Sequence, residues 1–440
     1  MPQYVPITVR YSRYLWKYEL TPAGRTLFFC VLVTSVGMAT VMVPVYQIFC
    51  VLFMAYVVIW LMNLAVRTKL KVTGQLPRRV TAGDQLRTEL TITNLSAWRP
   101  TYDVMLWLLD MPAAWKFESA DIAIPRLGPG ESGNIPLIFR PLSRGLYDLP
   151  ELRPHTTFPF NLMRSGSTRF PLGSVVVVPS FHPIQHLDVP VGTRYQPGGI
   201  ALSSNVGESP EYIGNREYVP GEPVRRLDFR SWARLGKPVI REYQEEYYCR
   251  IALVLDTYVP EPPQRGWKRF NPFTRAAAST PKSHSNDAAT ASTHASLKQA
   301  LEAAVQVAAA VADSLAATEH LIDLFAAGSR LYVFRAGRNL AHFDDVLDIL
   351  AAVDACPSNP FLTLSPAIAD ELSSITTAIL ILLDWDKTRE QLARTIIESG
   401  CQLKLIIVRD APTSAPLPGD FGEVTQLNVA SVFNGNIERL

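Results

Sequence analysis

The pattern of apolar positions changes three times along the chain, and its first part is an uninterrupted apolar run. Residues 26–66 contain no charged side chain. Because about 20 helical residues cross the hydrocarbon core of a bilayer, this run predicts two membrane-crossing helices that are separated near Pro44. The alternative, two buried helices of a soluble core, fits an apolar run of this length and purity less well.

Basic side chains lie on both sides of this apolar run, and the turn between its two helices carries no charge. Residues 1–25 form a basic N-terminal segment. The positive-inside rule therefore places both termini in the cytoplasm. The run is too long and starts too late for a cleaved signal peptide. The flanking basic residues are Arg10, Arg13, Lys17, Arg25, Arg67, Lys69, Lys71, Arg78 and Arg79.

Residues 67–184 alternate apolar and polar positions in short runs such as 86–93, separated by Asn, Pro and Gly clusters. This period of two with frequent turns is typical of a β-sandwich. Residues 128–133 match the G-x-G-x-x-G pattern of dinucleotide-binding proteins, but that pattern requires a helix that begins within it. Pro129 and its polar neighbours indicate a loop between strands instead, so we expect no nucleotide site there.

Residues 185–249 combine a linker rich in Gly, Ser and Pro with a charged segment, and residues 250–440 alternate continuous apolar runs with amphipathic stretches. The latter pattern predicts a largely parallel, doubly wound α/β domain. Within it, residues 260–295 have too few large apolar side chains for a core and are predicted to form a mobile loop. The predicted strands are 251–255, 321–325, 331–334, 378–383 and 403–408, and the predicted helices are 296–317, 344–353, 366–372 and 387–398.

The Ala-rich helix 296–317 is predicted to belong to the α/β domain. Glu302 and Asp313 leave only ten uncharged residues between them, and a charge in mid-bilayer is costly. The five cysteines lack metal-ligand spacing, which fits reduced thiols in the cytoplasm better than a disulfide scaffold. His182 and His186 are four residues apart, but Pro183 prevents the helix that would align them as metal ligands. Both are interpreted as loop histidines.

The segment 216–250 has a high density of charge of both signs, with eight Arg or Lys and six Asp or Glu. A nucleic-acid site needs an excess of basic groups, so we expect no nucleic-acid partner. Because guanidinium groups fit carboxylates with two hydrogen bonds, the segment predicts an ion-pair lattice, with a solvated loop as the alternative. The residues of this interaction or structural motif are Arg216, Glu217, Tyr218, Pro220, Gly221, Arg225, Asp228, Arg234, Arg241 and Glu242.

This segment also carries a family resemblance. The order R-E-Y-x-P-G-E-x-x-R-x-x-D from Arg216, followed by A-R-x-G-x-x-x-x-R-E from Ala233, resembles the signature of the bacterial domain of unknown function family 58. The stretches RPLSRGLYDL at 140–149 and FPFNL at 158–162 are similar to elements that precede that signature. Members of the family are membrane proteins with a von Willebrand factor A-like domain, often encoded beside MoxR-type AAA+ ATPases. Phe229 stands where Trp is common.

The resemblance implies a metal site of the form D-x-S-x-S at the end of the first α/β strand, where two hydroxyls complete an oxygen shell. Asp256, Thr363 and Asp384 match three ligand positions. Tyr258 and Pro260 replace the two serines, so we expect a degenerate site without a cofactor, which binds Mg²⁺ at most weakly. The structural alternative is that the two aspartates cap the following helices or loops.

No nucleophile elbow, Walker loop or catalytic His/Cys/Asp spacing is present, so the chain is predicted not to be an enzyme. The resemblance implies a two-pass bacterial inner-membrane protein that acts as a scaffold or adaptor with a MoxR-type AAA+ ATPase, in the assembly or remodelling of protein complexes. The client and the oligomeric state do not follow from these patterns. The alternatives are a metal-dependent ligand-binding protein of the von Willebrand A type and a hydrolase with an unrecognised site.

Overall fold

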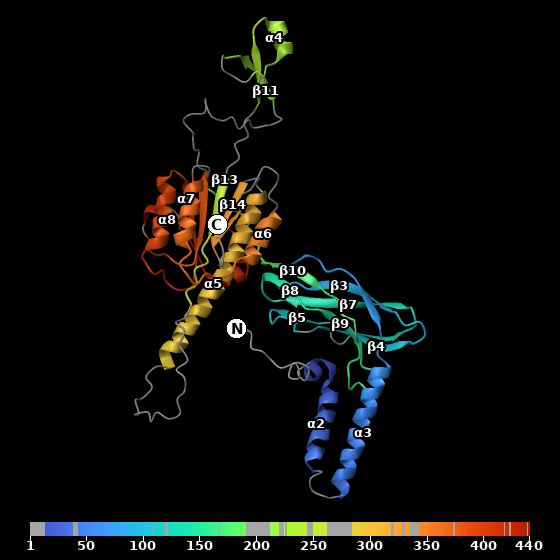
Figure 1. Cartoon of the computed structure of the whole chain (residues 1–440). Helices are drawn as coiled ribbons and strands as arrows, with labels where there is room; N and C mark the ends of the chain where they lie inside the picture. Colours follow the sequence, from blue (N-terminus) through green and yellow to red (C-terminus); the bar gives the residue numbers. More distant parts are fainter. Residues whose placement is uncertain are drawn as a thin grey trace. The chain divides into compact units, whose positions relative to one another are not determined.

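The computed structural model forms two compact units, Met1–Ser180 with Leu350–Ala352 and Phe181–Ile349 with Val353–Leu440. Figure 1 shows a chain that mixes helices with several separate sheets, in agreement with the predicted mixture of α and β structure. The described residues are 14–37, 43–108, 110–118, 122–166, 168–190, 212–219, 224, 227–243, 250–261, 284–317, 321–327, 331–334, 343–372, 375–417, 419–421, 424–437 and 439–440.

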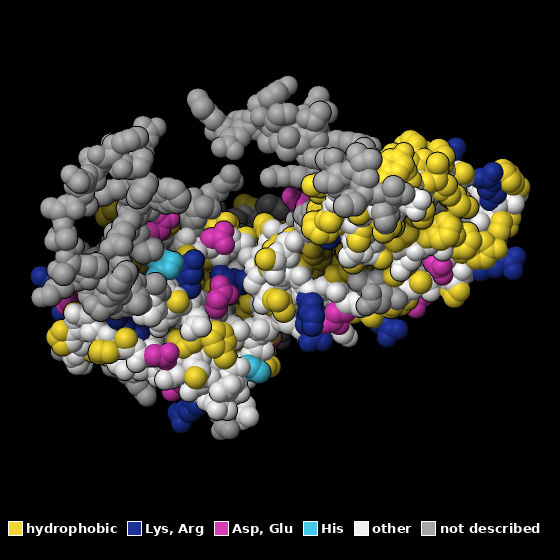
Figure 2. Space-filling view, turned by 90° about the horizontal axis from the view of Figure 1, so that it is seen from below, with side chains coloured by type: hydrophobic (Ala, Val, Ile, Leu, Met, Phe, Trp, Pro, Cys, Tyr) yellow, Lys and Arg dark blue, Asp and Glu magenta, His cyan; other side chains and the backbone are white. Residues whose placement is uncertain are grey.

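The first unit begins with two apolar helices that pack along each other, α2 (Pro22–Gly37) and α3 (Val43–Ala65), preceded by the short π-helix η1 (Leu15–Glu19). Pro22 opens α2, where a missing N–H breaks no helical hydrogen bond, and Pro44 lies in the first turn of α3 for the same reason. Large apolar side chains of both helices are exposed. Figure 2 shows hydrophobic side chains gathered over this part of the unit.

The rest of the first unit consists of three small sheets that enclose one hydrophobic core. Their strand orders are β1-β3-β7-β5, β2-β10-β8 and β6-β4-β9. Alternate residues of β3 and β7 are buried, as the period of two predicts. The strands are β1 (Leu70–Thr73), β2 (Arg79–Thr81), β3 (Leu86–Asn94), β4 (Thr101–Leu108), β5 (Trp115–Phe117), β6 (Ala123–Leu127), β7 (Ser132–Pro141), β8 (Gly145–Leu149), β9 (Leu152–Thr156) and β10 (Gly173–Val178).

The G-x-G-x-x-G match lies in a turn between two strands, as predicted. β6 ends at Leu127 and β7 begins at Ser132, so no helix begins in the glycine-rich stretch. The side chain of Glu131 closes the turn, because its Oε2 accepts a hydrogen bond of 2.6 Å from the Gly128 amide. The carboxylate of Glu131 therefore already accepts the hydrogen bond of an amide group that would otherwise bind a nucleotide phosphate.

The second unit contains a six-stranded sheet of order β15-β14-β13-β16-β17-β18, in which only β15 is antiparallel to its neighbour. Every residue of β16 is buried, because helices cover both faces of the sheet (Figure 1). This arrangement matches the predicted parallel sheet. The strands are β13 (Arg250–Leu255), β14 (Leu321–Ala327), β15 (Leu331–Phe334), β16 (Thr377–Leu382), β17 (Gln402–Val408) and β18 (Val424–Leu427).

The helices of this unit include one that begins earlier than predicted. α5 begins at His284 instead of Ser296, so the last twelve residues of the predicted loop 260–295 are helical; residues 262–283 lie outside the described part. Alanine has the highest helix propensity, and the Ala-rich composition that cannot form a core can still extend a helix. The helices are α5 (His284–Ala317), α6 (Phe343–Ala352), α7 (Phe361–Glu371), α8 (Lys387–Glu398), the 3-10 turn η3 (Gly419–Phe421) and α9 (Val429–Phe433).

Two further elements depart from the predicted pattern. α7 begins at Phe361, five residues before the predicted start, because Phe361, Leu364 and Ile368 share a buried face and Pro366 is tolerated inside the helix. β18 was not predicted. It is a four-residue edge strand whose side chains are only half-buried or exposed, so its sequence carries no clear alternation.

Candidate functional site

The charged segment folds into a small unit of two strands and one helix. β11 (Tyr212–Glu217) pairs antiparallel with β12 (Val239–Tyr243), and α4 (Phe229–Leu235) lies between them in the sequence. α4 ends because Gly236 adopts a φ of 69°, a left-handed conformation that favours glycine. The chain at 236–238 is therefore a helix C-terminus followed by the beginning of a strand.

Asp228 is the central hydrogen-bond acceptor of this small unit. Its Oδ1 caps α4 by accepting from the Arg230 amide at 3.2 Å and the Ser231 amide at 3.4 Å. Its Oδ2 accepts from Ser231 Oγ at 2.7 Å and Asn215 Nδ2 at 3.1 Å. The Arg241 guanidinium lies 3.4 Å from Oδ1.

These contacts hold the pKa of Asp228 well below its usual range. The side-chain hydrogen bonds from Ser231 and Asn215 lower it most, and they outweigh the opposing effect of burial. These hydrogen-bond donors cover the Asp228 carboxylate, although few other atoms of the chain lie around it. A charged Asp228 therefore joins β11, α4 and β12.

Two ion pairs of the predicted lattice are present among the described residues. Arg241 pairs with Asp228, while Glu217 pairs with Lys237 at 3.4 Å on the surface. Arg216 and Arg234 are exposed. Tyr218 is half-buried, and its amide donates to the Pro238 carbonyl at 3.0 Å. The residues Pro220, Gly221 and Arg225 and the side chain of Glu242 lie outside the described part of the chain.

One side of α4 is an exposed apolar surface. Phe229, Trp232 and Leu235 recur every three residues and all are exposed, with Phe229 at 64%. The rings of Phe229 and Trp232 stack with centroids 6.0 Å apart. Arg230 and Arg234 on the same helix are also exposed. The sequence shows this three-residue spacing, but a helix of seven residues gives too little periodicity to be predicted.

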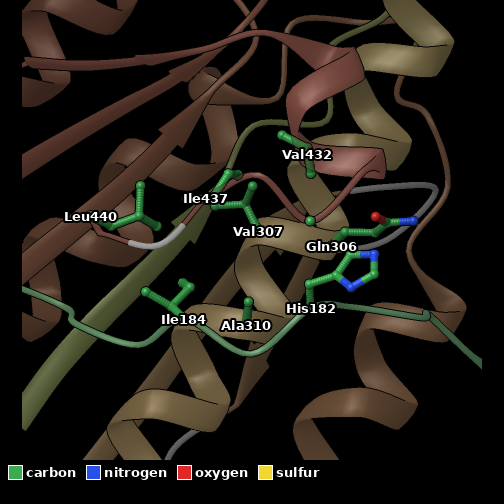
Figure 3. A pocket seen from close by; sticks show the side chains of 9 residues that line it. His182, Ile184, Gln306, Val307, Ala310, Val432, Ile437 and Leu440 are labelled. Carbon is green, nitrogen blue, oxygen red and sulfur yellow. The ribbon is translucent and has the colours of Figure 1, made fainter.

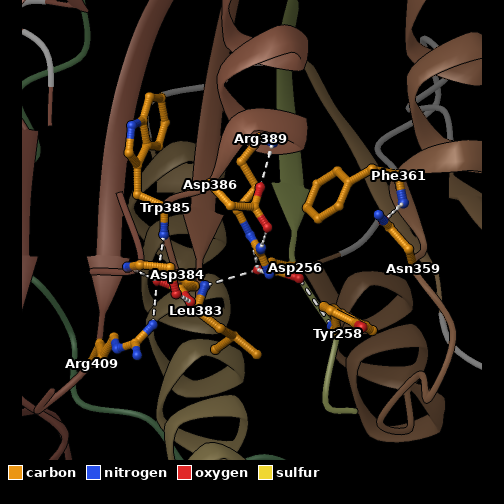
Figure 4. A network of polar contacts seen from close by, with 11 residues as sticks. Asp256, Tyr258, Asn359, Phe361, Leu383, Asp384, Trp385, Asp386, Arg389 and Arg409 are labelled. Atoms are coloured by element: carbon orange, nitrogen blue, oxygen red, sulfur yellow. Dashed lines mark hydrogen bonds and ion pairs between the residues drawn. The ribbon is translucent and has the colours of Figure 1, made fainter. Parts of the chain in front are cut away.

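A second candidate site lies at the carboxyl ends of β13 and β16, where Asp256 is completely buried (Figure 4). Asp256 Oδ2 accepts hydrogen bonds from Arg389 Nε at 2.8 Å, Arg389 Nη2 at 2.6 Å and the Leu383 amide at 3.0 Å. Its Oδ1 accepts from the Tyr258 amide at 2.9 Å. These four hydrogen bonds all come from donors of the chain itself.

Arg389 reaches Asp256 from the first turn of α8. Asp386 caps that helix, with Oδ1 accepting from the Arg389 amide at 2.9 Å and Oδ2 accepting from Nη1 at 2.5 Å. The guanidinium also lies 5.0 Å from the ring centroid of Phe361. Burial alone would lower the pKa of Arg389, but the charges of Asp256 and Asp386 raise it above its ordinary value. The guanidinium is therefore a permanent cation between two carboxylates.

Asp384 belongs to a different set of contacts. It accepts from the Ser414 amide at 2.9 Å, from Ser414 Oγ at 2.5 Å and from the Trp385 amide at 2.8 Å, and it pairs with Arg409. Burial raises the pKa of Asp384, but the hydrogen bonds from Ser414 and Arg409 bring it below the usual value. Asp386, not Asp384, is linked to Asp256 through Arg389.

Two of the three predicted metal-ligand positions, Asp256 and Asp384, follow strands, and each accepts hydrogen bonds from donors of the chain itself. Thr363 lies in the first turn of α7 and not in a loop before it, and its side chain is outside the described part. Among the described residues, no group of three His, Cys, Asp or Glu side chains is placed to hold a metal ion.

Sequence reasoning missed Arg389, Asp386, Arg409 and Ser414. A signal was present for Arg389, because a cation is unfavourable in the first turn of a helix unless acidic groups surround it. Asp386 stands three residues before it, at the N-cap. The second partner, Asp256, is 133 residues away in sequence and could not be inferred from spacing.

A shallow pocket in the second unit does not provide a ligand site (Figure 3). Its free volume is about 10 Å³, roughly the space of one water molecule. His182 packs against Gly435, where a Cβ would lie 2.8 Å from the ring, and His186 accepts a backbone hydrogen bond from Leu440 at 3.0 Å. The pocket is lined by His182, Ile184, Gln306, Val307, Ala310, Val432, Gly435, Ile437 and Leu440.

Comparison with known proteins leaves the chain without an assigned family. No family model matches it, and no curated protein matches it. Among solved structures, one match is the native conformation of the alpha-2-macroglobulin of E. coli, determined by cryo-electron microscopy. The identity is 21%, the match covers 26% of this chain and 7% of that chain, and the TM-score is 0.19. A superposition of this quality supports no statement about fold or function.

Proposed function

We propose that this protein is a two-pass scaffold or adaptor of a bacterial inner membrane, which binds a protein partner through the exposed apolar face of α4. By its sequence signature the partner is a MoxR-type AAA+ ATPase, and the chain belongs to the domain of unknown function family 58. In this proposal α2 and α3 form a transmembrane hairpin, the all-β part is a β-sandwich, and the six-stranded sheet is a von Willebrand A-like domain. The protein binds and does not catalyse.

The membrane part of the proposal is supported by the exposure of α3. Two described helices are long and apolar enough to cross a membrane, Val45–Ala65 and Ser292–Ala317. None of the apolar window in the first is buried, whereas 67% of that in the second is buried. This difference supports burial of α5 within the second unit and exposure of α3 to lipid.

α2 has 16 residues and spans about 24 Å, less than a bilayer core of about 30 Å. It completes a crossing only if residues 38–42, which lie outside the described part, continue the span. With two crossings, the basic residues that flank the pair of helices place both termini in the cytoplasm. Every other part of the chain is then accessible to a cytoplasmic ATPase.

The single observation that carries the partner proposal is the apolar face of α4. Aromatic side chains that remain exposed on a capped helix are typical anchors of protein interfaces. Phe229, Trp232 and Leu235 stand at i, i+3 and i+6, within an arc of about 120° around the helix, so they can enter one apolar groove together. The flanking Arg230 and Arg234 favour a groove with an acidic rim, because complementary charge accelerates and orients docking.

The Asp256 network supports binding without metal-dependent chemistry. In a metal-dependent ligand-binding protein, a divalent cation would coordinate the strand-end carboxylate. Here the Arg389 guanidinium occupies that carboxylate with bonds of 2.6 and 2.8 Å. A divalent ion at Asp256 would have to displace a buried positive charge or lie against it.

Co-purification from native membranes tests the partner. We expect the double substitution Phe229→Ser with Trp232→Ser to reduce recovery of the MoxR-type ATPase at least about ten-fold, because interface anchors typically contribute 2 kcal/mol or more. Leu362→Ser is the matched control, since Leu362 is a large exposed apolar residue on α7 of the same unit. Equal recovery with both variants, while α4 stays resistant to protease, would exclude this surface as the docking site.

A further inference from the structure

The loop between β3 and β4 is fixed to the residues that leave α3. Arg99 Nη1 donates a hydrogen bond of 2.6 Å to the carbonyl of Ala65, the last residue of α3. The Leu95 amide donates to the Lys69 carbonyl at 3.0 Å. The loop 95–99 therefore has a defined position beside one helix end.

This loop exposes large apolar side chains beside basic groups. Trp98 is 70% exposed, and Leu95 is also exposed. The Arg99 guanidinium lies 3.9 Å from the ring centroid of Trp98, a cation–π contact that orients the indole. The exposed side chains of Arg67 and Lys69 lie in the segment between α3 and β1, which accepts the hydrogen bond from Leu95. An amphipathic ring beside several cations is typical of the layer of lipid headgroups.

A second loop of the all-β part contacts the beginning of α2. The Thr21 amide donates to the Leu162 carbonyl at 3.2 Å, and Thr21 Oγ1 donates to the Asn161 carbonyl at 2.7 Å. A Cβ at Gly24 would lie 2.0 Å from the Leu162 oxygen, so only glycine allows this approach. Phe160 is exposed in the same loop. Both helix ends are thus bordered by loops with exposed aromatic residues.

We propose that these two loops form a membrane-contacting surface for a bilayer that contains anionic phospholipids. Trp98, Leu95 and Phe160 enter the boundary between headgroups and acyl chains, while Arg67, Lys69 and Arg99 face the phosphates of the headgroups. The surface fixes the all-β part against the membrane. This inference rests on the proposed crossing of the bilayer by α2 and α3.

The position of the loop 95–99 beside the end of α3 is the reason for proposing lipid as the partner of this surface. α3 has 23 residues and is about 35 Å long, which covers a hydrocarbon core of about 30 Å and brings Ala65 to its boundary. The exposed surface of Leu95 and Trp98 continues directly from that boundary, because Arg99 bonds to Ala65 itself. The cations match the negative potential of a cytoplasmic leaflet.

The same unit offers a matched control at its far end. Thr93 pairs with Ser132 at one end of β7, next to the loop, and β7 then runs ten residues to Pro141. At about 3.3 Å per residue, Leu142 lies roughly 33 Å along the strand from the proposed surface. Leu142 is 60% exposed, comparable with Trp98, so it differs in place and not in exposure.

Photo-crosslinking of the full chain in nanodiscs tests the surface. A p-benzoyl-phenylalanine residue is introduced at position 98, at position 95 or at position 142, and covalent lipid is measured by mass spectrometry. We expect several-fold more lipid on positions 98 and 95 than on position 142. The discs contain phosphatidylcholine and phosphatidylglycerol, so that the ratio of the two lipids on position 98 reports the role of the charges.

The double variant Arg67→Gln with Lys69→Gln tests those charges. Each basic side chain near an anionic surface contributes about five-fold to attraction, so the share of phosphatidylglycerol on position 98 should fall several-fold. The remaining basic residues around the helices keep the orientation. An unchanged share would refute the role of Arg67 and Lys69 in headgroup binding.

Alkaline extraction separates failure of this surface from failure of the membrane anchor. If the protein stays in the membrane but positions 95 and 98 acquire no more lipid than position 142, the surface does not contact the bilayer. If these positions crosslink to protein instead, the loop is a protein interface. If alkali releases the protein, α2 and α3 do not cross the membrane, and the proposed anchoring fails together with the surface.

Discussion

Two Asp–Arg pairs of the second unit illustrate how the same chemistry serves different ends. In the small unit around α4, Arg241 is 50% exposed and lies 3.4 Å from Asp228, which is 11% exposed. At the sheet edge, Arg389 is 3% exposed and lies 2.6 Å from Asp256, which is fully buried. Water screens the charges of the Asp228–Arg241 pair. The Asp256–Arg389 pair is buried, so water could not solvate one side chain if the other were removed.

The difference assigns a role to each region. The Asp228 contacts position a helix that carries exposed aromatic residues, so the pair supports the apolar surface that we propose as the docking site. The Asp256 contacts fill the strand-end position with a buried guanidinium of the chain itself. The two pairs have the same residue types, so it is their burial that differs. The exposed pair supports a surface, and the buried pair fills the space at a strand end.

The largest expected effect is that of breaking the buried pair. Arg389→Met leaves Asp256 charged and unpaired inside the protein, and we expect a loss of about 3–5 kcal/mol in the free energy of unfolding. Replacing Asp256 by Asn in the same chain removes the stranded charge, so the double variant should be less destabilised than the sum of the single variants. Urea unfolding of the second unit, followed in the full chain, measures both quantities.

A different outcome would change the interpretation of the site. If Arg389→Met unfolds with the wild-type midpoint, then water or another cation already satisfies Asp256, and the position is open. Arg394→Met is the matched control, because Arg394 on the same helix is half-exposed, pairs with Glu390 at i,i+4 and lies 5.3 Å from the ring centroid of Phe421. Its removal should cost about 1 kcal/mol.

Acid is expected to have a smaller effect, which is the loss of the stability that Asp228 gives to α4 and its two strands. The folded-state pKa of Asp228 is depressed, so its contribution to stability is fully present above the ordinary aspartate pKa of about 4 and is lost as the pH falls below that value. We expect the α4 amides to lose protection from hydrogen exchange in this range, after correction for the intrinsic rate. Asp228→Asn should already lack that protection at neutral pH and show no further loss.

The same measurement can separate the two sites. If the α4 amides of the wild-type chain and of Asp228→Asn respond to acid in the same way, another carboxylate controls the unit. The pKa of Asp384 is also depressed, so acid weakens its contacts with Ser414 and Arg409 with the same sign. These contacts lie at the sheet edge and do not affect the α4 amides directly.

Local sequence signals account for the elements better than for the site. α8 occupies 387–398 as predicted, because Asp386 is a standard cap and the apolar positions that follow keep helical spacing. The strands before Asp256 and Asp384 were predicted from continuous apolar runs. α4 was missed although Asp228 and Gly236 mark its two ends, because a helix of seven residues gives too little periodicity.

The contacts of the site depend on tertiary structure. Asp256 is joined to Arg389 across 133 residues, and Asp384 is joined to Ser414 across 30. Parallel strands bring their carboxyl ends to one edge, so the sequence places the two aspartates at that edge. It does not specify which cation reaches which carboxylate, because that depends on the docking of α8 against the sheet.

The smallest expected effect is the response to divalent cations. Asp256 is occupied by Arg389, the hydroxyl of Tyr258 stands at the far end of its ring, and Pro260 has no side-chain oxygen. An ion that binds only the folded state stabilises it by about 2.7 kcal/mol at a concentration 100 times its Kd. We therefore expect millimolar Mg²⁺ to leave the unfolding midpoint of the wild-type chain unchanged, apart from the shift that an equal ionic strength of NaCl produces. A Mg²⁺-specific shift that Asp256→Asn abolishes would show that the ion reaches this carboxylate, and the site would then have to open by releasing Arg389.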